Sequence, residues 1–134
     1  MRKVDEGVLY HSNLETWIKI EKGTAYIGLT DWAQTVIGSI SSIHFEFEKG
    51  RRIVQNGLLF EIESDKSISE IVSPITGYLY QVNEEIQTNP SIINNNSYWP
   101  NWVVAINNYD VDQIKEFLPS TDYKHSIDSF FRKS

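Results

Sequence analysis

Lys66 is the residue of this sequence best placed to take part in chemistry, because it lies in a short polar segment between two apolar ones. Residues 58–63 and 68–72 alternate or run apolar as strands do, and Ser64-Asp65-Lys66-Ser67 separates them. This arrangement predicts a hairpin with Lys66 at its tip. A modifying enzyme could reach such an amine without unfolding the protein, and acylation would turn it into a long neutral arm. Taken alone, the spacing fits an ordinary solvated turn lysine better.

The other reactive side chains form no recognisable catalytic or metal-binding motif. The absence of cysteine excludes disulfides, thiolate catalysis and Cys-ligated zinc. None of His11, His44 and His125 has a His or Glu at the spacing of a helical metal site. Neither a nucleophile elbow nor a phosphate-binding loop is present. We therefore expect no catalytic residue, no metal ligand and no active site of its own.

Composition narrows the class of protein further. The chain has 134 residues, which fits a single domain 1–134, and its 13% aromatic content can fill a real core. A net charge of -6 argues against a nucleic-acid binder and against docking on an anionic membrane. No apolar run is long enough for a signal peptide or a membrane span. A cytoplasmic protein is expected, with the mature form of an organellar protein as the open alternative.

The elements that must position Lys66 follow from periodicity and turn residues. A helix over 31–37 should begin at Thr30, whose hydroxyl can cap it, and end at Gly38. Asn56-Gly57 predicts a turn before the Lys66 hairpin. Residues 1–12 are expected to be an irregular arm and 83–101 a long surface loop. The strands are expected over 17–21, 25–29, 43–47, 58–63, 68–72, 78–82 and 102–106.

The C-terminal segment 110–131 changes to a helical period. Asp110 can cap a first helix, with Val111, Ile114, Phe117 and Leu118 on one side, and Pro119 should end it. Tyr123, Ile127, Phe130 and Phe131 fall at helical spacing on a second helix, as core-facing residues do.

Six segments resemble motifs of one known family, in the same order and spacing. The family is the H protein of the glycine cleavage system, and the resemblance runs from about Trp17 to Tyr123. The segments are Ile27 to Gln34 (I-G-I-T-D-x-A-Q in the family), Glu63 to Ser67 (E-S-V-K-A), Ser73 to Gly77 (S-P-V-S-G), Val82-Asn83-Glu84 with Asn89 to Asn94 (V-N-E and N-P-x-L-I-N), Tyr98 with Trp102 (Y-G-x-G-W), and the acidic tail from Asp110 to Tyr123.

The resemblance implies a mainly β fold, the lipoyl-carrier β-sandwich or barrel-sandwich hybrid, with short helices and a helical C-terminal tail. It implies that Lys66 carries lipoate. Enzymes that modify the family read the Glu three residues before the lysine and the Gly eleven after it, which are Glu63 and Gly77 here. We also expect Gly77 to matter more for modification than for the existence of the fold, since a turn glycine permits close approach.

The implied function is that of a carrier, not an enzyme. Its lipoyl arm would shuttle an aminomethyl group between glycine decarboxylase and the aminomethyltransferase, and dihydrolipoyl dehydrogenase would reoxidise it. A lipoate ligase or an octanoyl or lipoyl transferase would attach the cofactor. Two alternatives stay open. One is a divergent H-like carrier that serves another lipoate-dependent pathway, such as sulfur oxidation, or regulation. The other is an interaction module whose Lys66 is never modified.

Some residues depart from the family pattern. Asp65 replaces the usual Val, which makes the tip similar to the E-T-D-K-A site of 2-oxo acid dehydrogenase lipoyl domains. Those domains lack the segment from Thr30 to Gln34 and the tail helices, and biotinyl domains have Met beside their lysine. Residues 44–48 and 99–101 also differ. Because an unpaired charge at a docking surface is costly, Asp65 is expected to influence partner docking.

Overall fold

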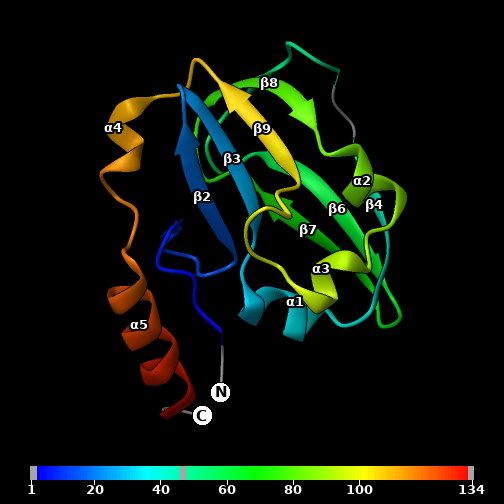
Figure 1. Ribbon diagram of the computed structural model, residues 1–134, viewed down its shortest axis with the longest axis vertical. Coiled ribbons are helices and arrows are strands. Elements are labelled where there is room, and N and C mark those ends of the chain that lie inside the picture. The colour runs from blue at the N-terminus through cyan, green and yellow to red at the C-terminus, as the bar shows by residue number, and fades with distance from the viewer. Residues whose placement is uncertain (1–2, 46–47, 133–134) are drawn as a thin grey trace.

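Two antiparallel sheets form the body of the protein (Figure 1). The structure, a computed structural model, describes residues 3–45 and 48–132. Within these residues the six-stranded sheet has the order β1 (Leu9–Tyr10), β2 (Thr16–Glu21), β3 (Thr24–Leu29), β9 (Val104–Asn107), β8 (Gly77–Val82) and β5 (Arg52–Ile53). The three-stranded sheet has the order β4 (Ile40–His44), β6 (Leu58–Ser64) and β7 (Ile68–Val72). The helices are α1 (Asp31–Ile37), α2 (Glu84–Thr88), α3 (Ile92–Asn95), α4 (Val111–Ile114) and α5 (Ser120–Arg132).

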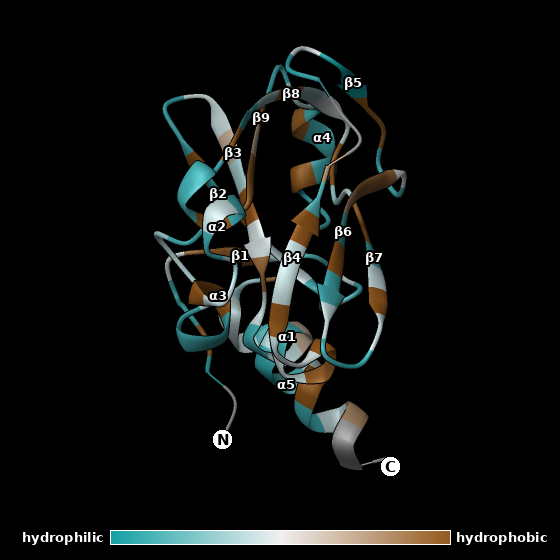
Figure 2. Cartoon of the chain, turned by 90° about the vertical axis from the view of Figure 1, so that its right-hand side faces the viewer, coloured by the Kyte–Doolittle hydropathy of each residue, from teal (hydrophilic) through white to brown (hydrophobic). Residues whose placement is uncertain are grey.

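The main hydrophobic core combines residues of both sheets. Ile27 and Ile106 come from the six-stranded sheet, and Phe60, Ile62 and Ile71 from the three-stranded one; all are at most 1% exposed. Residues that alternate with them along the strands, such as Tyr26 and Glu61, are only partly covered. This alternation is the period-two pattern of a sheet with one buried face. The arrangement confirms the predicted β-sandwich and holds the β6–β7 hairpin at one end (Figure 2).

Helix α1 has the boundaries that the sequence predicts. Thr30 caps it by accepting a hydrogen bond from the Ala33 amide at 3.1 Å, while its own hydroxyl donates to the Leu14 carbonyl at 2.7 Å. Gly38 ends it with a φ of 95°, a value that side-chain-bearing residues rarely adopt. The chain thereby turns directly from α1 into β4, beside the tip of the β6–β7 hairpin (Figure 2).

Two sequence predictions need correction. The strand expected over 43–47 begins earlier, at Ile40, and ends at His44, while Phe45 packs against the core just outside it; residues 46–47 lie outside the described part. The segment 83–101 is not a plain loop, because it contains α2 and α3. Each helix buries one isoleucine, Ile86 or Ile93. A single apolar residue per helix is too weak a signal to emerge from an Asn-rich segment.

The structure of both terminal segments also differs from the prediction. The arm 1–12 contains β1, which pairs Tyr10 with Trp17. Helix α4 is capped by Asp110 but ends at Ile114, and Val111 is 65% exposed instead of facing the core. In α5, Tyr123 stacks on Tyr10 with ring centroids 3.9 Å apart, whereas Phe130 is half exposed; the side chain of Phe131 lies outside the described part. In the described ranges, no helix is long and apolar enough to cross a membrane.

Candidate functional site

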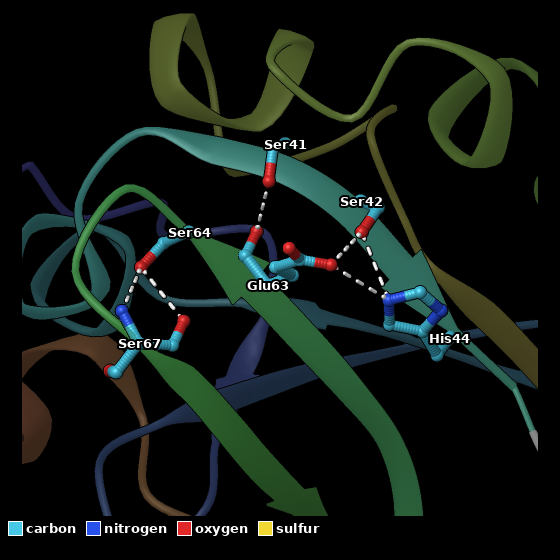
Figure 3. A network of polar contacts seen from close by, with 6 residues as sticks. All are labelled: Ser41, Ser42, His44, Glu63, Ser64 and Ser67. Atoms are coloured by element: carbon cyan, nitrogen blue, oxygen red, sulfur yellow. Dashed lines mark hydrogen bonds and ion pairs between the residues drawn. The ribbon is translucent and has the colours of Figure 1, made fainter.

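The tip of the β6–β7 hairpin is closed by the hydroxyl of Ser64. This oxygen accepts a hydrogen bond from the amide of Lys66 at 3.2 Å. It also accepts from the Ser67 amide at 3.3 Å and donates to the Ser67 carbonyl at 3.2 Å (Figure 3). The Ser64 amide also donates to the Ser67 carbonyl, at 2.9 Å. Two-residue hairpin loops usually need positive φ angles, but neither Asp65 nor Lys66 adopts one. The serine side chain thus adds three hydrogen bonds to the single backbone hydrogen bond between Ser64 and Ser67 that closes the turn.

The tip is tied to the loop that follows α1. The Asp65 amide donates to the Ser39 carbonyl at 3.1 Å, and the Ser39 amide donates to the Asp65 carboxylate at 3.2 Å. A Cβ on Gly38 would lie 2.8 Å from that carboxylate and 3.3 Å from Lys66 Cε. The absence of a side chain at Gly38 therefore lets the aliphatic stem of Lys66 lie across the loop.

The loop after α1 is itself held by the side chain of Asn94 in α3. Its side-chain oxygen accepts from the Ile40 amide, and its side-chain nitrogen donates to the Gly38 carbonyl and to Gln34 Oε1, all at 2.9 Å. Gln34 and Asn94 belong to two motifs that lie 60 residues apart in sequence, and their hydrogen bond joins these motifs near the tip. Sequence reasoning missed this link, although each motif ends in one of the two amides.

The amine of Lys66 is accessible and unengaged. The residue is exposed, and within the described ranges its Nζ has no hydrogen-bond or ion-pair partner. Another tip lysine, Lys22 in the β2–β3 hairpin, is exposed too. The residues three before and eleven after Lys22 are Lys19 and Ala33, not Glu and Gly. Exposure at a tip is therefore common to both lysines, and only the surroundings of Lys66 match the predicted attachment site.

Glu63 points away from the core, on the outer face of the three-stranded sheet. Its Oε1 accepts a hydrogen bond from the Ser42 hydroxyl at 3.1 Å and lies 3.3 Å from His44 Nε2 (Figure 3). Both contacts lower the pKa of the Glu63 carboxyl, and the hydrogen bond from His44 has the larger effect. Since hydrogen bonds to the charged form favour it, the carboxylate stays ionised at neutral pH.

We expect this shift to be visible in a pH titration of the Glu63 carboxyl by NMR. Its midpoint should lie below the value of the same residue in the unfolded chain, and His44→Ala should raise it. Because the folded-state pKa is the lower one, the stabilisation is present at neutral pH and is lost as the pH falls through that pKa. A midpoint in the folded wild type that is unchanged by His44→Ala would contradict the described hydrogen bonds.

Gly77 lies away from the other predicted site residues. Strand β7 separates it from Lys66, and it pairs with Ile53 at the other end of the sandwich (Figure 2). A Cβ on Gly77 would lie 2.4 Å from Ile106 Cγ2 and 3.0 Å from the Asn107 carbonyl, and its φ is not positive. The close approach that Gly77 permits is to the protein's own strand β9, so the packing favours a structural role for this glycine beside the expected role in modification.

Comparison with known proteins gives the family. The family model described as "Glycine cleavage H-protein" matches residues 8–130. The chain belongs to this family. The glycine cleavage system H protein of Geobacillus sp. (strain WCH70) is 32% identical over 119 residues, which are 89% of this chain and 93% of that protein. The probable glycine cleavage system H protein of Thermococcus gammatolerans (strain DSM 15229 / JCM 11827 / EJ3) is 32% identical over 129 residues, or 95% and 94%.

A solved structure supports the same fold. The crystal structure of a glycine cleavage system H protein from Mycobacterium marinum superposes with a TM-score of 0.79 at 21% identity, covering 92% of this chain and 98% of that one. Members of this family are lipoyl carriers and not catalysts. The family membership confirms both the resemblance seen in the sequence and the expectation of a carrier instead of an enzyme.

Proposed function

We propose that Lys66 is the residue to which lipoate is attached and that the chain works as the lipoyl carrier of a glycine cleavage system. The observation that supports this most is the unengaged amine of Lys66 on a tip that is braced on both sides. Ser64 closes the turn from within, and Asp65 ties it to Ser39. A rigid base with a free amine suits an enzyme that must bring one nitrogen to an acyl group.

The bond-forming chemistry of the attachment step uses only this nucleophile of the chain. The neutral ε-amine attacks the carbonyl carbon of an activated lipoyl or octanoyl group, the activating group leaves with the bonding electrons, and a proton passes to solvent. An amide forms, and the charge of Lys66 disappears. We infer that a lipoate ligase or an octanoyl or lipoyl transferase performs this step and reads Glu63 as one recognition element. A direct reading of Gly77 remains part of the proposal.

The attached lipoyl group would supply reversible dithiol chemistry and the thiol that accepts the aminomethyl group. The residues of the chain orient and tether this arm. The Ser39–Asp65 and Asn94 contacts fix its root, so that the arm reaches its partners at a high effective concentration once the carrier docks. The partners that we propose are glycine decarboxylase, the aminomethyltransferase and dihydrolipoyl dehydrogenase.

Asp65 is the observation that favours a specialised, H-like carrier as a second candidate. Its charge lies beside the root of the arm, where the family usually has Val. One of its oxygens already accepts the Ser39 amide, so only part of the carboxylate is open to a partner. A decarboxylase shaped for valine would meet the remaining charge, which costs free energy unless a basic group pairs with it.

A test of partner choice uses lipoylated wild type and lipoylated Asp65→Val with a generic glycine decarboxylase. Exchange of bicarbonate into glycine is the measurement. Full activity of the wild type, with no gain from valine, is expected of an ordinary glycine cleavage carrier. Poor activity that valine restores would instead establish the specialised carrier and refute the ordinary role.

A further inference from the structure

Three side chains meet around one oxygen on the outer face of the three-stranded sheet. Ser42 Oγ lies 3.0 Å from His44 Nε2, and both approach Glu63 Oε1, at 3.1 and 3.3 Å (Figure 3). Strand register explains the meeting, because Ser42 of β4 lies directly opposite Glu63 of β6. His44 is two residues further along β4, on the same face. We call these residues the Ser42–His44–Glu63 triangle.

The triangle is not a hydrolytic triad. In such a triad the serine and the carboxylate bond to different ring nitrogens of the histidine. Here both contacts go to Nε2, and the histidine and glutamate are about half exposed. Since Nε2 faces a carboxylate oxygen, it carries a hydrogen and acts as a donor. Ser42 and His44 therefore both direct hydrogens toward Glu63.

The consequence is a glutamate held by one of its two oxygens. Within the described residues, Oε2 of Glu63 takes no hydrogen bond, so it is open to a cationic or N–H donor of another protein. The neighbouring strand places Ile68 opposite Glu63, and it is 62% exposed. The next outward-facing charges are Glu61, opposite His44, and Glu70, opposite Glu61. None of these three residues donates a hydrogen bond to the Glu63 side chain.

We propose that Ser42 and His44 are positioning residues that hold Glu63 in the orientation read by the enzyme that attaches lipoate. This inference rests on the proposed function and adds two residues that the family motifs do not contain. An unbraced glutamate has several rotamers, and the enzyme would have to order it on binding. Ordering one such side chain costs enough to weaken recognition roughly 2- to 10-fold. The effect belongs to binding, so it should appear in KM and not in kcat.

The test measures kcat and KM for lipoylation of the full chain by a purified lipoate ligase, with lipoate and ATP, followed by intact mass. Ser42→Ala and His44→Ala should each raise KM roughly 2- to 10-fold. His44→Gln should restore much of the loss, because its amide can donate from a similar position. In a Glu63→Ala background, which removes the acceptor oxygen, neither alanine substitution should weaken modification further, since residues that act through one group are not additive.

Two matched controls lie beside the triangle. Ser41→Ala removes a hydroxyl that donates to the Glu63 backbone carbonyl, at 3.1 Å, and not to its side chain. Glu61→Gln removes a carboxylate of the same strand and face. Both should keep the wild-type KM, and melting curves should show that every variant is folded. Unchanged KM in Ser42→Ala and His44→Ala, or an undiminished effect in the Glu63→Ala background, would overturn this inference alone. A wild type that is never modified would overturn the proposed function as well.

Discussion

Lys66→Arg should abolish carrier activity without weakening the fold. Arginine keeps a cation at the tip, but its guanidinium remains protonated and does not act as an acyl acceptor. The hydrogen bonds that shape the tip come from Ser64, Ser39 and Asp65, none of which uses the lysine amine. After treatment with a lipoate ligase, the variant should support no exchange of bicarbonate into glycine above background, with the melting temperature of the wild type.

The matched control is Lys22→Arg in the other hairpin. Lys22 is also an exposed tip lysine, with a φ of 50° that arginine tolerates as well as lysine does. This variant should keep full activity. An equal loss of activity in both variants would show that replacing any tip lysine lowers activity, and that Lys66 is not a specific attachment site. Residual activity of Lys66→Arg would mean that another residue carries the arm.

Gly77→Asn should destabilise the protein severely, and modification should fail for that reason. The smallest added side chain would press on Ile106 Cγ2 at 2.4 Å and on the backbone of Asn107 at 3.0 Å. Both residues belong to β9, which is paired on either side by β3 and β8 and cannot withdraw. Overpacking of this kind costs about 3 kcal/mol, which should lower the melting temperature by roughly 10 °C.

Gly50→Asn is the control for this substitution. Gly50 has a φ of 88° with nothing within 4 Å of a built Cβ, and asparagine tolerates positive φ best after glycine. Because a φ of 88° strains any residue with a side chain, its melting temperature should fall somewhat, but less than that of Gly77→Asn, which adds a packing clash. If Gly77→Asn melted like the wild type while its lipoylation slowed, the glycine would be read directly by the modifying enzyme and the packing argument would be wrong.

The sequence was sufficient where one residue determines a local structure. Thr30 and Gly38 define both ends of α1, because a cap hydroxyl and a positive φ each have few substitutes. The polar interruption at residues 64–67 likewise identifies the Lys66 hairpin.

The sequence was insufficient where a role depends on a partner distant in the chain. Gly77 packs closely against Ile106, and the loop next to Lys66 is held by Asn94. The brace on Glu63 depends on the register of β4 against β6. A shift of one residue in that register would direct Ser42 and His44 into the core. Such cross-strand contacts leave no spacing that a single sequence could reveal.

Lys66, and no other residue, should carry the lipoyl group. The most direct measurement is the intact mass of the wild-type chain produced together with a lipoate ligase and supplied with lipoate, followed by fragmentation to locate the added group. One lipoyl group per chain is expected, on the fragment that contains Lys66 and on no other lysine, Lys22 included. A group found on another residue would refute Lys66 as the attachment site, and a chain that remains unmodified under these conditions would favour an unmodified interaction module.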